Sequence, residues 1–324
     1  MLTKLRIQRG FSLVELMVAM VIGLFLALGL AAMFNMSATN VTTTSQYGQL
    51  QENGRIALAL MERDLSQLGF MADITGTDFI VGGNTTVEPV IPAASDCIGA
   101  GANNGSLPNN TPAHFRKLWG YENVVGGASL ACLSGVAEET DVIQLKRLVG
   151  PNTLAPTNSS RIYVATTSNE AVFFQGSGTP PTLLNGRYWE YQHHVYYIAK
   201  NASEVPELRR KTLTANGMTN EEQLVEGIEN MRILYGFDND GDDTADSYMP
   251  AQNVSSLMWD NELFQRLVSL RVFLLVRSVE ADRTYTNDVV YTLGDKTIGP
   301  KGDGFRRRVV STTIVLENPV LIRN

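Results

Sequence analysis

Histidine and cysteine are scarce in this sequence, which holds three histidines and two cysteines among its 324 residues. Two thiols do not make a zinc site. His193 and His194 are neighbours in an expected strand, so their side chains would point to opposite faces, while His114 stands alone in an expected loop. The sequence has no Gly-x-Ser-x-Gly motif and no nucleophile paired with a base. We therefore expect structural histidines and a protein that is not an enzyme.

Basic residues are also in deficit, with 26 lysines and arginines against 33 acidic residues and a net charge of −7. Such a balance argues against a polyanion as the main partner. Two short basic runs, at 209–211 and 306–308, are not interleaved with aromatic residues as a surface for single-stranded nucleic acid would be. We expect both runs to lie on solvated strand edges, and we expect no nucleic-acid partner.

A long apolar run covers residues 11–34, and Ser12 and Glu15 are its only polar residues. At about 1.5 Å per residue, a helix over this run would be about 36 Å long, which is enough to span a bilayer. The short basic segment before the run would stay in the cytoplasm. We therefore expect a single-pass inner-membrane protein with most of its chain in the periplasm.

Two ordinary interpretations of this run leave Glu15 unexplained. A secretory signal peptide, cleaved near Ala31 and Ala32, has an apolar core of only about 7–15 residues. It would predict a soluble periplasmic binding protein or hydrolase whose mature chain lacks residues 11–30. A plain membrane anchor would carry an unpaired acid, which costs about 2.5–3.5 kcal/mol in a spanning helix.

The stretch GFSLVE, from Gly10 to Glu15, follows the basic segment and opens the apolar run. It resembles the type IV prepilin signal, in which a dedicated peptidase cuts after the glycine and the new N-terminal residue is N-methylated. The resemblance implies a leader over residues 1–10, cleavage between Gly10 and Phe11, and a retained helix over residues 11–34. The amine of Phe11 and the carboxylate of Glu15 would lie on one helix face. In a filament this carboxylate can pair with the amine of a neighbouring subunit.

Residues 35–70 continue the helical pattern beyond the apolar run. A polar stretch rich in Ser and Thr leads to QLQENGRIALALMERDLSQLGF at 49–70, whose apolar residues recur every three or four positions except across Gly54. This predicts an amphipathic continuation of the first helix that packs on a globular head, with Gly69 as a helix stop. The segment resembles the PilW-type minor pilins of type IV pili and, more distantly, the J-type pseudopilins of type II secretion.

The head, residues 71–324, is expected to be rich in β-strands. Residues 71–140 hold Gly, Asn and Pro clusters, which predict long loops and short strands. Strand patterns dominate afterwards, with one short helix expected at 220–228. The expected strands are 141–148, 161–167, 170–175, 188–200, 207–213, 229–238, 266–278 and 306–318. The predicted fold class is α+β and pilin-like, a long N-terminal helix packed on a mostly antiparallel sheet.

In an exported protein the two cysteines, Cys97 and Cys132, favour one disulfide. The bridge would close a loop of 36 residues. The chain-entropy estimate for such a loop is about 3–4 kcal/mol. The alternative is two unrelated buried thiols.

An acidic run begins at the end of the strand expected at 229–238. Asp238, Asp240, Asp242 and Asp246 have the one-three-five-nine spacing of a calcium loop, which needs hard oxygen ligands. The run lacks the glycine and the bidentate glutamate of an EF-hand, and a solvated polar turn is the alternative. The sequence implies no cofactor other than this calcium ion.

The family resemblance implies a minor pilin that helps to initiate and assemble a type IV pilus, near the filament tip. Its implied partners are other minor and major pilins, the prepilin peptidase and the inner-membrane assembly platform. We expect the protein first in the inner membrane, with its head in the periplasm, and then in the pilus at the cell surface. A minor pseudopilin of a type II secretion system is the alternative with the same chemistry.

Overall fold

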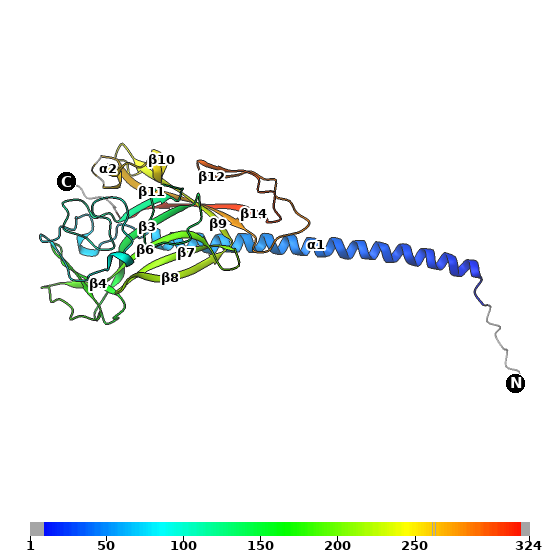
Figure 1. The fold of residues 1–324 in the computed structure, drawn as a ribbon, viewed down its shortest axis with the longest axis horizontal. Coiled ribbons are helices and arrows are strands. Elements are labelled where there is room, and N and C mark those ends of the chain that lie inside the picture. Colours follow the sequence, from blue (N-terminus) through cyan, green and yellow to red (C-terminus); the bar gives the residue numbers. More distant parts are fainter. Residues whose placement is uncertain (1–9, 261, 263, 319–324) are drawn as a thin grey trace, which may run out of the picture. The chain divides into compact units, whose positions relative to one another are not determined.

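The computed structural model describes residues 10–260, 262 and 264–318. The predicted leader, residues 1–10, lies outside the described residues except for Gly10. The described part contains one long helix and sheets of eight, four and two strands (Figure 1). This is the α+β fold expected from the sequence, with a long N-terminal apolar helix and a mostly antiparallel β-sheet domain.

The long helix, α1, runs without a break from Leu13 to Leu65 (Figure 1). No proline interrupts it, and its first half is rich in leucine, alanine and methionine, which lose little side-chain entropy in a helix. A turn follows the helix and includes the predicted stop Gly69, whose φ of +81° is readily adopted only by glycine. The chain divides into two compact units, Met1–Gln49 and Leu50–Asn324, which are described separately.

The largest sheet has eight strands. Their bounds are Thr85–Val87 for β1, Leu118–Glu122 for β2, Asp141–Thr153 for β3, Ile162–Thr166 for β4, Ala171–Gln175 for β5, Arg187–Lys200 for β6, Pro206–Thr214 for β7 and Gly217–Glu226 for β8. Neighbouring strands follow the order β1-β5-β4-β6-β3-β2, and β7 and β8 branch from β6. All pairs in this sheet are antiparallel except β1 with β5.

A second sheet has four antiparallel strands in the order β10-β9-β11-β14. The remaining bounds are Ile228–Asp238 for β9, Ser247–Pro250 for β10, Arg266–Arg277 for β11, Tyr291–Leu293 for β12, Lys296–Ile298 for β13, Arg307–Val315 for β14 and Ser256–Trp259 for α2, with 3-10 turns at Ala72–Ile74, Ala93–Ser95 and Ala251–Asn253. Strands β12 and β13 form a separate hairpin. Each strand predicted from the sequence has an observed counterpart.

The short helix predicted at 220–228 is wrong, because most of this segment is strand β8. A tight turn folds β8 back on β7, and Glu221 lies opposite Lys211 across the two strands. Glu222 lies opposite Arg210, and their side chains form an ion pair of 2.6 Å. Opposite charges that face each other on paired strands stabilise the pairing. The stabilisation from these cross-strand ion pairs outweighs the local preference of the glutamates for a helix.

The apolar stripe predicted after the membrane run is buried against the head. The fully buried residues of this stripe on α1 are Leu50, Ala57, Met61 and Leu65. Gly54, which interrupts the spacing of the stripe, is also buried. A side chain there would come within 2.9 Å of Val310 on β14 and within 3.1 Å of Val276 on β11. The missing side chain therefore lets the helix backbone approach the four-stranded sheet closely.

Replacing Gly54 by leucine should lower the free energy of unfolding by about 1–3 kcal/mol, since the added atoms must displace Val310 and Val276. The matched control is Gly48→Leu, because no atom lies within 4 Å of a side chain placed at Gly48. Replacing an exposed helical glycine by leucine should instead stabilise by up to about 1 kcal/mol. Urea unfolding of the full-length protein in detergent micelles gives both values. Equal values for the two variants would contradict the close approach.

Asp64, near the end of α1, is the centre of a buried polar cluster. Its carboxylate lies 2.5 Å from Nδ1 of His194 and accepts a hydrogen bond of 2.7 Å from the hydroxyl of Tyr196, both on β6. Nε of Arg147 on β3 donates to the same carboxylate at 2.7 Å. Burial alone would raise the pKa of Asp64, but His194 and Arg147 outweigh it and hold this pKa well below its usual range. The cluster attaches this end of the helix to the large sheet.

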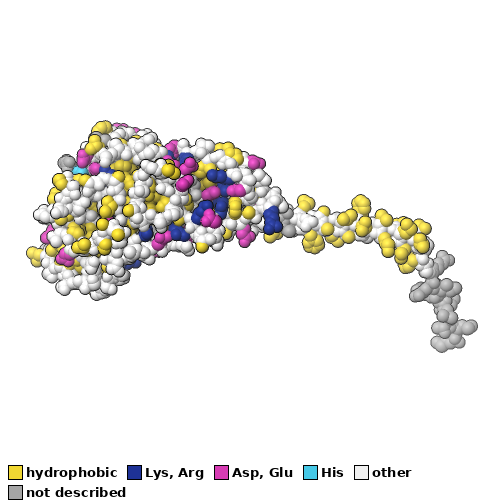
Figure 2. Space-filling view, viewed as in Figure 1, with side chains coloured by type: hydrophobic (Ala, Val, Ile, Leu, Met, Phe, Trp, Pro, Cys, Tyr) yellow, Lys and Arg dark blue, Asp and Glu magenta, His cyan; other side chains and the backbone are white. Residues whose placement is uncertain are grey.

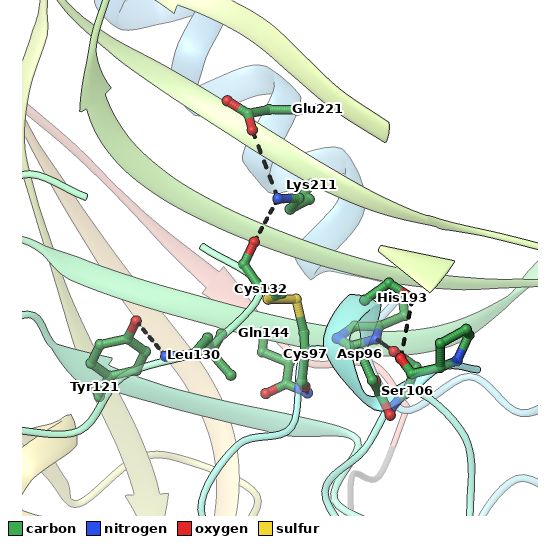
Figure 3. Close-up of a disulfide and its surroundings, with 12 residues drawn as sticks. Asp96, Cys97, Ser106, Tyr121, Leu130, Cys132, Gln144, His193, Lys211 and Glu221 are labelled. Atoms are coloured by element: carbon green, nitrogen blue, oxygen red, sulfur yellow. Dashed lines mark hydrogen bonds and ion pairs between the residues drawn. A yellow bond between two sulfur atoms is a disulfide. The ribbon is translucent and has the colours of Figure 1, made fainter. Parts of the chain in front are cut away.

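Cys97 and Cys132 form the predicted disulfide (Figure 3). Gln144 on β3 donates a hydrogen bond of 3.3 Å to the carbonyl of Cys97. Lys211 on β7 donates one of 2.5 Å to the carbonyl of Cys132. The disulfide and these two bonds hold the loop-rich segment, which was expected at 71–140, against strands of the large sheet.

Candidate functional site

The residues predicted for processing and assembly lie at the start of α1. Gly10 and Phe11 precede the helix, and both are exposed. The backbone N–H of Ser12 donates to Oε2 of Glu15 at 2.9 Å, and the N–H of Glu15 donates to Oγ of Ser12 at 3.2 Å. Each of the two side chains thus satisfies the backbone N–H of the other residue, which is the arrangement called a capping box.

This capping box gives Glu15 a role that sequence reasoning missed. Its signal was present as Ser-x-x-Glu directly before an apolar run. The first N–H groups of a helix have no partner within the helix, and the positive end of the helix dipole favours a carboxylate there. Glu15 is therefore already held at the start of the helix in the single chain.

The helix surface that follows Glu15 is apolar on all sides. Every large hydrophobic side chain from Leu13 to Met36 is at least 52% exposed (Figure 2). Among the described residues, α1 is the one helix that is long and apolar enough to cross a membrane. A helix that packs on a soluble domain needs only one apolar stripe, whereas one that is apolar all round needs lipid or other apolar helices around it.

The predicted calcium ligands lie in the loop between β9 and β10. One oxygen from each of Asp238, Asp240 and Asp246 lies within 4.8 Å of the others. Asp242 instead accepts hydrogen bonds of 2.8 and 2.5 Å from the N–H and the hydroxyl of Thr244. Backbone N–H groups of the loop donate to Asp238 and hold the pKa of its carboxyl below the usual value. The structure brings three of the four predicted ligands together, and calcium binding stays a prediction.

The three histidines each have a polar partner. Nδ1 of His114 lies 2.6 Å from a carboxylate oxygen of Asp78. Nδ1 of His193 lies 3.0 Å from the hydroxyl of Ser106 (Figure 3), and His194 belongs to the cluster around the end of α1. In the described ranges, the acidic loop is the one group of three or more potential metal ligands. The contacts of the histidines support structural roles for them.

The expectation of solvated strand edges is wrong for the run at 209–211, while part of the run at 306–308 lies on the edge strand β14, where Arg308 is exposed. In the run at 306–308, the side chain of Arg307 is 1% exposed and donates hydrogen bonds to Glu229 and Asp303. The run at 209–211 lies on β7, an inner strand between β6 and β8. Its side chains form ion pairs with carboxylates of β7 and β8. The guanidinium groups of Arg209, Arg210 and Arg307 are therefore already paired with carboxylates.

Comparison with family models gives two matches at different places in the chain. Residues 5–31 match the prokaryotic N-terminal methylation motif, and residues 195–318 match PilW, the type IV pilus-assembly protein W. Neither description names an enzyme. No curated protein and no solved structure matches the chain. The first match covers the capping box and most of the exposed apolar helix, and the second covers strands of both large sheets. Together they support a type IV pilus minor pilin of the PilW type.

Proposed function

We propose that this minor pilin takes part in the initiation and assembly of a type IV pilus, near the filament tip. The observation that carries the proposal is the combination, on one chain, of a methylation motif on an all-round apolar helix and a PilW match in the head. Before assembly the protein is a single-pass inner-membrane protein with its head in the periplasm. Its partners are other minor and major pilins, the prepilin peptidase and the inner-membrane assembly platform.

Cleavage between Gly10 and Phe11 would place a new amine directly before Ser12. The capping box holds the carboxylate of Glu15 close to this position, because it accepts the N–H of Ser12. A neighbouring subunit can offer its own N-terminal amine in exchange for that N–H. Such an exchange replaces one polar partner by another, so no charge is left unpaired when the apolar helices pack together.

The first test is the mature N-terminus of protein isolated from the native cell envelope. N-terminal sequencing and intact mass should show a chain that begins with methylated Phe11. A chain that begins near Met33 would mean that the apolar helix is discarded, and it would support a soluble periplasmic protein with an ordinary signal peptide instead.

Replacing Glu15 by glutamine should reduce incorporation into pili by about 5–30-fold, the effect of losing about 1–2 kcal/mol from a polar contact between helices. Glutamine can still close the capping box, so the variant separates the charge of Glu15 from its role in the helix start. The measurement is an immunoblot of sheared pili against the membrane fraction, with Glu62→Gln on the exposed face of α1 as the control. Wild-type incorporation of the Glu15 variant would contradict the pairing with a neighbouring amine.

Deletion of the protein should reduce surface piliation and twitching motility, since fewer filaments would start. The direct measurements are electron microscopy of surface pili and the width of the twitching zone. Normal pili together with a defect in protein secretion would favour the alternative function, a minor pseudopilin of a type II secretion system.

The acidic loop is proposed to bind calcium weakly, with a dissociation constant of about 0.1–1 mM as in extracellular modules. Asp238→Asn should abolish the binding, because Asp238 offers one of the three clustered oxygens. Asp242→Asn is the matched control, since the carboxylate of Asp242 contacts Thr244 instead. Calorimetric titration of the full-length protein in micelles measures calcium binding by the wild type and by both variants. Absence of heat in the wild-type protein would leave the solvated turn as the explanation.

A further inference from the structure

Strand β2 leaves one edge of the large sheet open. It ends the strand order, so β3 lies on one side of it and no strand of the described chain lies on the other. The carbonyl of Lys117 accepts the N–H of Lys146 at 2.8 Å. The N–H of Asn123 donates to the carbonyl of Thr140, also at 2.8 Å. Because antiparallel bonding alternates along a strand, odd-numbered residues of β2 bond to β3 and even-numbered residues face the open edge.

The main-chain groups on this open edge have no hydrogen-bond partner within the described residues. Leu118, Gly120 and Glu122 each turn one N–H and one C=O away from β3. Leu118 is 2% exposed, and Gly120 is also buried. More than about 90% of buried main-chain groups in proteins are paired. A buried row of unpaired groups therefore marks a place that another backbone can complete.

A cavity of about 470 Å³ borders this edge. One wall is β2, including Gly120, and most of the other is the segment 251–259, which contains α2. The guanidinium of Arg116 holds the second wall, because it donates hydrogen bonds of 2.7 Å to the hydroxyl of Ser256 and to Oδ2 of Asp260. The cavity is therefore a groove between two fixed walls, beside the unpaired backbone groups.

The hydroxyl of Tyr235, on β9, lies buried against Gly120. A side chain at position 120 would overlap the hydroxyl, so only glycine fits there. Tyr235 is fully buried, and among the described residues its hydroxyl has no hydrogen-bond partner. Residues that pair directly across two strands carry their side chains on the same face, about 4.5–5.5 Å apart. A residue paired with Gly120 would thus carry its side chain on the sheet face beneath which this hydroxyl is buried.

We propose that the groove beside β2 receives an extended segment of a neighbouring filament subunit, which adds to the large sheet as a further strand. This inference rests on the proposed function, which supplies the neighbouring subunit. The unpaired groups of Gly120 and Glu122 are two residues apart, about 6.6 Å, which is the repeat of an extended polypeptide. Main-chain hydrogen bonds supply the affinity.

The charges that line the groove argue for a backbone ligand over an ionic one. Arg116 is already paired with Asp260. Glu122 is paired with Lys296 at 2.6 Å and with Arg232 at 3.0 Å. Both charged side chains of the lining therefore have partners, whereas the main-chain donors and acceptors on the edge of β2 do not. An added strand supplies the partners that these main-chain groups lack.

The test fills the groove without changing the buried core. Ala128 and Gln252 are exposed and line the groove, so Ala128→Trp and Gln252→Trp should fold normally, which thermal unfolding checks. Ala155→Trp, at an exposed position outside the groove lining, is the matched control. Each full-length variant is expressed with the other minor and major pilins of its own system, and the complex is isolated in detergent.

We expect the two groove variants to bind the other pilins about tenfold or more weakly, and the control to bind normally. In the wild-type complex, the amides of Gly120 and Glu122 should exchange with deuterium about tenfold or more slowly than in the chain alone, because pairing protects them. Normal binding by both groove variants, or unchanged exchange in a formed complex, would overturn the groove as a docking site and leave the pilin function intact. Failure of the wild-type chain to bind any pilin would overturn the proposed function and this inference together.

Discussion

Replacing Asp64 by alanine is expected to lower the free energy of unfolding by about 3–5 kcal/mol, the usual cost of breaking a buried ion pair from one side. The change removes the acid that faces His194, Tyr196 and Arg147. The side chain of Arg147 is only 8% exposed, so loss of the carboxylate leaves a largely buried charge without its ion-pair partner. Urea unfolding of the full-length protein in micelles, followed by tryptophan fluorescence, measures the loss.

The matched control for this variant is Glu62→Ala, an exposed acid on the same helix. Its effect should stay within about 0.5 kcal/mol, as for most surface substitutions. Asp64→Asn keeps the shape of the side chain but removes its charge. Its loss of unfolding free energy should fall between those of Asp64→Ala and Glu62→Ala. A loss below about 1 kcal/mol for Asp64→Ala would show that the cluster does not anchor the helix to the sheet.

The same cluster predicts that the protein loses stability in acid. Burial opposes ionisation of Asp64, but His194 and Arg147 hold its pKa well below the usual range in the folded state. In the unfolded chain an aspartate titrates near about 3.9. A lowered pKa stabilises the fold above the unfolded value, and this contribution is lost as the pH falls below about 4. The wild type should therefore lose stability between about pH 5 and 2 more steeply than Asp64→Asn. The measurement is the urea midpoint of each protein as a function of pH. Parallel curves for the two proteins would refute the assignment of this acid sensitivity to Asp64.

Removing the disulfide by Cys97→Ala together with Cys132→Ala should lower the free energy of unfolding by about 3–4 kcal/mol. The bridge closes a loop over a sequence separation of 35, and most of that loop lacks regular strands. Without the bridge the unfolded chain gains conformational freedom, which favours unfolding. Urea unfolding of oxidised protein measures the difference between the variant and the wild type.

Reduction of the wild-type protein provides an independent control for the disulfide prediction. Reduced wild type and the double variant should have the same stability within about 1 kcal/mol, since both lack the cross-link. The double variant should also be insensitive to reductant. A stable double variant, with a loss well below about 1 kcal/mol, would mean that the hydrogen bonds of Gln144 and Lys211 hold the loop without the bridge.

Local patterns predicted much of this fold. The helical period of the stripe after the membrane run and the strand patterns after residue 141 all appear in the structure, because each depends on neighbouring residues along the chain. The disulfide was also predictable, since two cysteines allow only one pairing. The capping box of Ser12 and Glu15 was equally local and could have been found from its spacing.

The segment 220–228 shows where a local pattern fails. Its glutamates are good helix formers, but cross-strand pairs such as Glu222 with Arg210 stabilise strand β8. The expectation of a solvated edge fails for the run at 209–211 for the same reason, because carboxylates of β8 pair with its arginines. Within the run at 306–308, Arg307 is also buried and paired, whereas Arg308 is exposed. Arg307, for example, contacts Glu229 across a sequence separation of 78.

The sequence by itself determined the apolar helix, the processing motif, the disulfide and the fold class of this protein, because composition and short-range spacing decide each of them. Only the tertiary structure decided that Asp64 meets His194, that Gly54 lies against the four-stranded sheet, and that three loop aspartates come together. It also decided that the edge of β2 is left open. Asp64 and His194 are 130 positions apart, and a contact over that distance depends on how all the strands between them are ordered, which the spacing of neighbouring residues does not encode.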